Sequence, residues 1–131
     1  MPMKRGYKAL LDEANAAIEA VSPAEASELA GDDDVVLVDI RDIRELQREG
    51  RVPGAIHAPR GMLEFWVDPE SPYHREVFAT GKTFIFFCAA GWRSALATKT
   101  VQDMGLTPVK HIEGGFGAWR EAGLPVDLPE K

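Results

Sequence analysis

The alternation of apolar and polar residues predicts a chain in which helices and strands follow one another. Apolar residues recur at three- and four-residue steps from Tyr7 onward, which predicts an amphipathic helix over roughly residues 4–17. A shorter helix is predicted from Ser22 to Ala30. A cap residue, a proline and an acid open this segment, and a glycine follows its end.

Two runs are apolar on both faces, as strands in the middle of a parallel sheet are: VVLVDI at 35–40 and TFIFF at 83–87. Shorter strands are predicted within 53–59 and at 109–112, and helices between and after the strands, at 41–50, 94–105 and 114–123. Residues 61–81 fit no single element and are predicted to be a long excursion with one or two helical turns. The alternation of strand and helix predicts an α/β class with a mostly parallel central sheet.

The bulk composition narrows the class of protein. At 131 residues, with 45% apolar and 27% charged residues, the chain is expected to form one soluble domain. A net charge of −6 argues against nucleic-acid and anionic-membrane partners, and no apolar run approaches the ~20 residues that span a bilayer. Acidic residues near the N-terminus argue against a targeting segment, so the predicted location is cytoplasmic.

One cysteine and three histidines limit the chemistry that the chain can perform. A single cysteine excludes an internal disulfide. His57, His74 and His111 lack the spacing of metal ligands, so no metal site is expected and each is interpreted as exposed or hydrogen-bonded. Cys88 is then either a buried apolar residue or a reactive thiol.

The position of Cys88 favours the reactive thiol. It directly follows the strand TFIFF and precedes a helix expected to open at Ser94, which is where ligands bind in parallel α/β sheets. Gly91 allows successive N–H groups of the loop to turn inward, while the helix N-terminus and Arg93 add positive charge. A thiol above such a cradle ionises more readily, and the thiolate is the nucleophile.

Four stretches follow one another along the chain: VLVDIRDIREL, EGRVPGAIHAPRG, CAAGWRS and HIEGGFGAWREAGLPV. They resemble, in turn, the first signature strand, the G-H-I-P-G-A-I stretch, the C-x-x-G-x-R-S active loop and the closing signature of single-domain rhodaneses, the thiosulfate sulfurtransferases. The resemblance implies a rhodanese-like three-layer fold for residues 21–131, with a mostly parallel central sheet flanked by helices. Residues 1–20 lie outside that core and are interpreted as an extra N-terminal helix. Arg51 stands where the family usually has histidine, which is expected to affect packing and not chemistry.

The resemblance also implies a mechanism in which Cys88 carries sulfur. Its thiolate would attack a small anionic donor such as thiosulfate and become a persulfide, from which cyanide, a thiol or a protein acceptor would remove the sulfur. No metal or organic cofactor is required. The active loop that would bind the substrate comprises Ala89, Ala90, Gly91, Trp92, Arg93 and Ser94.

Side chains outside the loop are candidates for supporting roles. Arg93 either binds the donor anion or locks the loop by pairing with Asp39 or Glu45, and both roles can hold together. The other charges after the first core strand are interpreted as a solvated or salt-bridged face. Because the excursion at 61–81 is expected to begin at the sheet edge that carries Cys88, it is also a candidate pocket wall. Candidates for donor binding and for this wall are Arg60, Phe65 and Trp66.

Two other functions remain open at this stage. Phosphatases and arsenate reductases of related fold need one more residue between cysteine and arginine than the four found here, and the smaller loop suits a single sulfur atom better. A persulfide-carrier or partner-binding module with little turnover on small donors needs the same cysteine. Steady-state turnover with thiosulfate distinguishes such a carrier from an enzyme.

Overall fold

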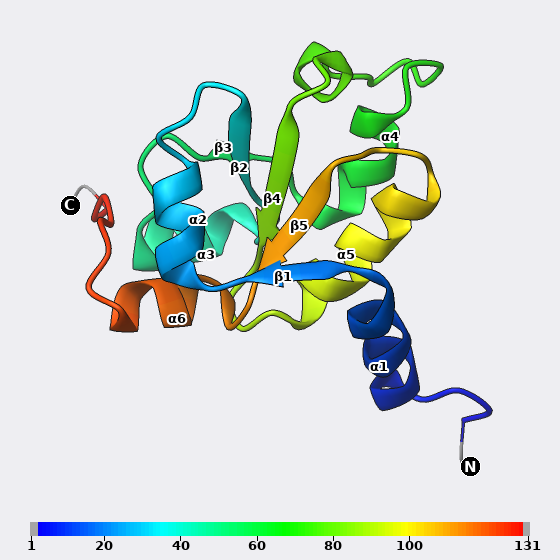
Figure 1. Ribbon diagram of the computed structural model, residues 1–131, viewed down its shortest axis with the longest axis horizontal. Coiled ribbons are helices and arrows are strands. Elements are labelled where there is room, and N and C mark those ends of the chain that lie inside the picture. The colour runs from blue at the N-terminus through cyan, green and yellow to red at the C-terminus, as the bar shows by residue number, and fades with distance from the viewer. Residues whose placement is uncertain (1–2, 130–131) are drawn as a thin grey trace.

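A computed structural model describes residues 3–129 as three layers, with helices on both faces of a central sheet (Figure 1). The strands are β1 (Glu19–Val21), β2 (Val35–Asp39), β3 (Ile56–His57), β4 (Thr83–Phe87) and β5 (Val109–Ile112). Their order across the sheet is β1-β5-β4-β2-β3, and each neighbouring pair is parallel. The predicted α/β class with a parallel sheet is confirmed.

The helices divide between the two faces of the sheet (Figure 1). One face carries α1 (Tyr7–Ala17), α4 (Leu63–Val67) and α5 (Trp92–Asp103), and the other carries α2 (Pro23–Leu29), α3 (Ile43–Glu49) and α6 (Gly115–Glu121). Short 3₁₀ turns at Arg60–Met62 (η1) and Glu76–Ala79 (η2) complete the elements.

Strand β4 lies in the middle of the sheet and separates two hydrophobic cores. Phe84 and Phe86 pack into the core beneath α4 and α5, whereas Ile85 and Phe87 pack into the core beneath α2 and α6. All four are fully buried, and each contributes about 2 kcal/mol of transfer free energy. A strand with a core on both sides must be apolar at every position, which is why TFIFF lacks polar alternation.

Local sequence signals account for the helix starts on the second face. Helix α2 begins with a capping box between Ser22 and Glu25, and α3 begins with one between Asp42 and Glu45. In each box the first side chain accepts a backbone N–H of the first turn, and the glutamate accepts the N–H of the cap residue.

Two elements differ from the sequence prediction. Strand β1 was missed, because its three residues continue the helical spacing of the segment before it and are too few to show alternation. Helix α5 begins at Trp92, two residues before the predicted Ser94, because Gly91 already takes the left-handed conformation of a cap. The excursion has the short helical turns that were predicted for it: one five-residue helix, α4, between the two 3₁₀ turns.

The charges at and after β2 form salt bridges, the second of the two alternatives considered from the sequence, and two of them are buried while Arg44 is exposed. Arg41 and Asp39 are buried, and the Asp39 carboxylate accepts hydrogen bonds from Nε and Nη2 of Arg41 at 2.8–3.1 Å. The guanidinium also donates to the carbonyl of Gly50 and lies 4.0 Å from the centroid of the Phe116 ring. Burial of both charges requires this pairing, so the ion pair joins the end of β2 to α3 and α6.

Helix α1 packs along α5. Gln102 donates a hydrogen bond to the carbonyl of Ala17 at 2.8 Å, and Lys99 lies 3.7 Å from Glu13. The strand that follows α1 joins the sheet, since Ala20 of β1 pairs with His111 of β5. A separate status for residues 1–20 stays a prediction.

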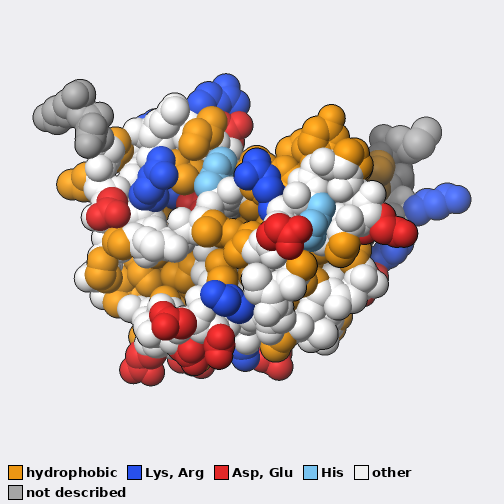
Figure 2. All heavy atoms as spheres, turned by 90° about the horizontal axis from the view of Figure 1, so that it is seen from above, with side chains coloured by type: hydrophobic (Ala, Val, Ile, Leu, Met, Phe, Trp, Pro, Cys, Tyr) orange, Lys and Arg blue, Asp and Glu red, His pale blue; other side chains and the backbone are white. Residues whose placement is uncertain are grey.

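The surface is consistent with the negative net charge. In the face shown in Figure 2, acidic side chains gather along the lower border, and hydrophobic side chains are exposed between the charged ones. Within residues 3–129, no helix combines the length and the apolar character needed to cross a membrane.

Candidate active site

Cys88 lies at the carboxyl end of β4, in a tight turn that leads into α5. Gly91 caps that helix with φ +100°, a conformation that residues with a side chain rarely adopt. A Cβ at this position would lie 3.4 Å from the backbone nitrogen of Gly114, so the loop also runs close to the turn before α6.

The sulfur of Cys88 is surrounded by hydrogen-bond donors. The backbone N–H groups of Gly91 and Ser94 donate to Sγ, at 3.1 and 3.4 Å, and Sγ lies 3.5 Å from the Ser94 hydroxyl oxygen. These N–H groups belong to the first turn of α5, where the helix dipole favours negative charge. The sulfur itself is buried, since the residue is only 1% exposed.

The Ser94 hydroxyl connects the sulfur to a histidine that sequence reasoning had not assigned to the site. Oγ of Ser94 lies 3.0 Å from Nδ1 of His111, which extends from β5 and is 4% exposed. Burial lowers the pKa of His111, and the opposing effect of Glu113 is smaller, so the imidazole is neutral at pH 7. Its hydrogen bond fits the earlier interpretation, but nothing in the spacing of the sequence indicated its proximity to Cys88.

Arg93 pairs with Glu45, one of the two partners considered from the sequence. Its Nη1 and Nη2 donate to the two carboxylate oxygens at 2.8 and 2.9 Å, a bidentate geometry. The hydrogen bonds from Arg93 are the largest cause that lowers the pKa of Glu45. The same contact raises the pKa of Arg93, and the nearby Cys88 sulfur contributes a smaller part. Asp39, the other candidate, is occupied by Arg41.

The turn before α6 holds the loop from behind. The N–H of Phe116 donates to the Cys88 carbonyl at 2.7 Å, and the N–H of Gly117 donates to the Ala89 carbonyl at 3.0 Å. Gly115, with φ +62°, lies so close that a Cβ there would be 2.4 Å from the Cys88 carbonyl oxygen. The paired glycines of HIEGGFG thus have a specific task in the site, which the resemblance alone had not assigned.

Trp92, the first residue of α5, is 60% exposed beside the loop. Its ring stacks in a tilted arrangement against Tyr7 of α1, with centroids 5.3 Å apart. Between these helices and the end of β5 lies a pocket of about 320 Å³, lined by Asn15, Gly91, Trp92, His111 and Glu113. The N-terminal helix therefore contributes to the surroundings of the loop.

Arg60, the residue just before the excursion, lies near the edge of the sheet that carries Cys88. The N–H of Arg60 donates to the Ile40 carbonyl just beyond β2, and the Arg60 side chain lines a cleft with Leu10 and Leu96. Phe65 is 53% exposed, and Trp66 packs against the core with the Arg75 guanidinium 4.1 Å from its ring centroid.

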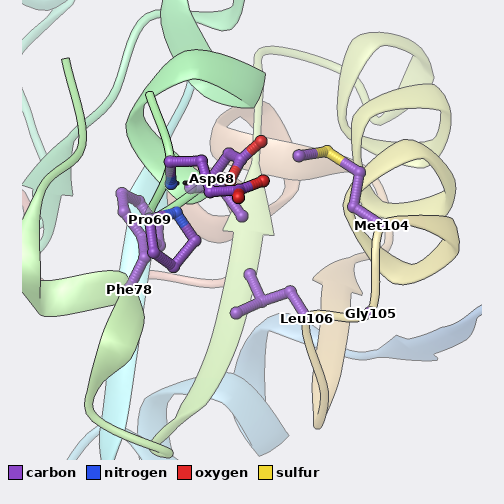
Figure 3. Close-up of a pocket in the computed structure, with 8 residues that line it drawn as sticks. Asp68, Pro69, Phe78, Met104, Gly105 and Leu106 are labelled. Carbon is purple, nitrogen blue, oxygen red and sulfur yellow. Dashed lines mark hydrogen bonds between the residues drawn. The ribbon is translucent and has the colours of Figure 1, made fainter. Parts of the chain in front are cut away.

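Most of the excursion lies at the other end of the strands (Figure 1). A pocket of about 490 Å³ there is lined by apolar side chains of Val67, Phe78, Met104 and Leu106, with Asp68 beside them (Figure 3). It meets the last turn of α5, about 18 Å along the helix from the loop. The idea that residues 61–81 as a whole border the active site is therefore wrong, because the chain must return to the amino end of β4 before Cys88.

The geometry places a buried cysteine sulfur, which accepts hydrogen bonds from two backbone N–H groups, at the carboxyl end of a central strand of a parallel α/β fold. Within the part of the chain that the structure describes, no group of three or more His, Cys, Asp or Glu residues is placed to hold a metal ion. The profile of the rhodanese-like domain matches residues 22–122, and the chain belongs to that family.

Relatives support the family assignment and show its range. The chain is 32% identical to a sulfurtransferase of Allochromatium vinosum, over 86% of this chain and 96% of the relative. A solved structure from Rhodopseudomonas palustris CGA009, described as a possible tyrosine phosphatase, is 58% identical with a TM-score of 0.93, covering 97% of this chain and 98% of that one. The polysulfide-sulfur transferase of Wolinella succinogenes is 32% identical with a TM-score of 0.72, covering 95% of this chain and 88% of that one. Together, family and sulfurtransferase relatives support sulfur transfer as the general activity.

We predict that Gly115→Ala disrupts the loop. The substitution combines about 1–2 kcal/mol of left-handed strain with a clash against the Cys88 carbonyl. Gly123→Ala is the matched control, because Gly123 also has positive φ but a Cβ there meets nothing within 4 Å. The midpoint of chemical denaturation and the alkylation rate of Cys88 should both change more in Gly115→Ala than in Gly123→Ala. Equal effects in the two variants would contradict the inference that the close approach of Gly115 to the Cys88 carbonyl holds the loop in place.

We predict that neutral His111 makes stability depend on pH. Its pKa in the folded chain lies below the unfolded value of about 6.5, so the unfolded chain binds more protons in the window below that value. The free energy of unfolding should therefore fall as pH falls from about 7 to about 5. His111→Leu should remove the part of the pH dependence that comes from His111. The difference in the free energy of unfolding between the unaltered protein and this variant should therefore narrow towards acid pH. A constant difference would contradict the buried neutral state.

Proposed function

We propose that the protein is a sulfurtransferase in which Cys88 carries the transferred sulfur as a persulfide. The observation that carries the proposal is the sulfur at the carboxyl end of β4, where it accepts two backbone N–H groups from the first turn of α5. The donor is a small anion with a sulfane sulfur, such as thiosulfate. The acceptor is cyanide, a thiol or a protein thiol.

The first half-reaction loads the cysteine. The Cys88 thiolate attacks the outer sulfur of thiosulfate, a new S–S bond forms, and the S–S bond of the donor breaks with its electron pair on the departing sulfite. The N–H groups of the loop and the start of α5 stabilise the negative charge on the terminal persulfide sulfur. In the second half-reaction the acceptor takes that sulfur, and the electron pair of the Cys88 S–S bond returns to Sγ.

Arg93 combines the two roles considered from the sequence. Its bidentate pair with Glu45 fixes the side chain against α3, which supports a structural role. Its side chain is 39% exposed, and the nearby Cys88 sulfur contributes to its raised pKa, which supports a second role in attracting the donor. Since Glu45 compensates the charge, the backbone N–H groups remain the main anion-binding elements in this proposal.

Sulfur transfer is favoured over phosphate chemistry, even though one related structure is described as a possible tyrosine phosphatase. A phosphoryl group presents three outer oxygens to its binding loop, whereas a persulfide presents one sulfur atom. In this chain the two amide contacts converge on Sγ itself. A loop with four residues between Cys88 and Arg93 fits the smaller group.

A persulfide carrier with slow turnover is the alternative within the same chemistry. The single exposed aromatic pair beside the loop among the described residues, Tyr7 and Trp92, gives a protein acceptor a surface to contact. Multiple turnovers with thiosulfate and cyanide would identify an enzyme, and one sulfur per chain without turnover would identify a carrier.

The first test of the function is sulfur loading. Incubation with thiosulfate should add the mass of one sulfur atom at Cys88, and cyanide should release it as thiocyanate, measured by mass spectrometry and colorimetry. Cys88→Ser should abolish both signals, because no other cysteine is present in the 131 residues. Full thiocyanate production by Cys88→Ser would refute the mechanism.

The second test compares sulfur with phosphate. Hydrolysis of aryl phosphates should be negligible beside sulfur transfer, because the loop is one residue too short for a phosphoryl group. Inserting one glycine between Ala90 and Gly91 should raise affinity for phosphate or arsenate and lower sulfur transfer. A second glycine insertion at Gly105, where a Cβ meets nothing within 4 Å, controls for a general effect of insertion. Robust phosphatase activity of the unaltered protein would overturn the assignment.

A further inference from the structure

Three polar atoms form a continuous row that starts at the nucleophile. Sγ of Cys88 lies 3.5 Å from Oγ of Ser94, and that oxygen lies 3.0 Å from Nδ1 of His111. All three residues are at least 96% buried, so bulk water does not compete for these hydrogen bonds. Such a row can hold a proton at either end, since a serine hydroxyl both donates and accepts.

We propose that His111 is a positioning residue that controls the protonation of Cys88 through the Ser94 hydroxyl. This inference rests on the proposed role of Cys88 as the sulfur carrier. It assigns to a residue of β5 the control of the protonation of Cys88, in addition to the hydrogen bonds that the strand-to-helix loop supplies.

The two states of the row differ by one proton. With a thiol, Cys88 donates to Ser94 Oγ, Ser94 donates to Nδ1 of His111, and the imidazole hydrogen is on Nε2. When the thiol proton moves to Ser94 Oγ, the hydroxyl proton moves to Nδ1, and the resulting imidazolium releases its Nε2 proton to water. The thiolate then accepts the Ser94 hydroxyl, and Ser94 accepts Nδ1–H. No oxidant or other reactant is needed.

The surroundings of His111 provide an exit for that proton. His111 and Glu113 line the pocket of about 320 Å³ beside Trp92, and Asn15 of α1 lines it from the other side. Glu113 is the carboxylate that acts on the charge of His111. From β1, Ala20 is its register partner, and the Lys110–Glu19 ion pair lies one position before it on the two strands. From α5, Ser94 faces His111, and the Cys88 sulfur lies on the other side of the Ser94 hydroxyl.

Alkylation of Cys88 is a clean readout, because the chain has no second cysteine. The rate of iodoacetamide addition, followed by mass spectrometry as a function of pH, reports the thiolate fraction. His111→Leu should lower the thiolate-to-thiol ratio on the order of tenfold, which moves the midpoint of the profile up by about one pH unit. A profile identical to that of the unaltered protein would overturn the proposal.

A double-mutant cycle with Ser94→Ala separates the row from simple packing. If His111 acts through the Ser94 hydroxyl, His111→Leu should shift the profile in the unaltered background and cause little further shift in Ser94→Ala. Equal shifts in both backgrounds would show that His111 acts by another route and would overturn the proposal. Thermal unfolding of each variant reports whether it folds.

The control is His74→Leu, since His74 also makes a histidine hydrogen bond, to the Trp66 carbonyl at 3.0 Å, but lies on the excursion. It should leave the alkylation profile unchanged. If His111→Leu does not fold, nuclear magnetic resonance of the unaltered protein tests the proposal instead. With ¹⁵N-labelled histidine, the Nδ1 resonance of His111 should shift with the same midpoint as alkylation, and its insensitivity to that transition would overturn the proposal.

The outcomes also separate this inference from the function on which it rests. If the unaltered protein transfers no sulfur, the proposed function fails, whatever the alkylation profiles show. If it transfers sulfur and His111→Leu keeps both the alkylation profile and the pH dependence of transfer, only the role of His111 fails.

Discussion

The site depends on the carbonyl of Cys88, which two segments far apart in sequence must share. The peptide that ends β4 carries this carbonyl, and the N–H of Phe116 at the start of α6 reaches it at 2.7 Å. The approach is possible only because Gly115 has no side chain. Once this contact is made, the direction in which the Cys88 side chain leaves the strand is fixed. The sulfur then faces the first turn of α5 and its N–H groups.

Glu45 shows how one side chain can serve both fold and site. Its Oε2 accepts the N–H of Asp42 at 3.0 Å and thereby completes the capping box of α3. The same oxygen accepts Nη1 of Arg93 at 2.8 Å. The start of α3 and the orientation of Arg93 are consequently coupled, and the buried pair of Asp39 and Arg41 anchors the preceding turn. Helix formation and preparation of the site are parts of one arrangement.

The sequence allowed the prediction of features that depend on neighbouring residues. The buried strand TFIFF, the capping signals at Ser22 and the position of Cys88 after β4 all follow from local pattern and were found. Contacts between distant segments carry no such signal. The proximity of His111 to Ser94 depends on the order of β5 and β4 in the sheet, and the burial of Arg41 depends on Phe116 packing over it. The excursion was misplaced for the same reason, since its length alone does not tell at which end of the sheet it lies.

The burial of Cys88 bears on which of two sulfur atoms a nucleophile can attack in the proposed persulfide. The cysteine residue is 1% exposed, and an added sulfur extends about 2 Å beyond Sγ. An incoming thiol therefore meets the outer atom first, while the inner atom, Sγ, stays buried below it. Attack at the outer atom passes the sulfur on, whereas attack at the inner atom would leave a mixed disulfide on the protein. Depth of burial thus imposes regioselectivity on the reaction, without any group that distinguishes the two sulfurs chemically.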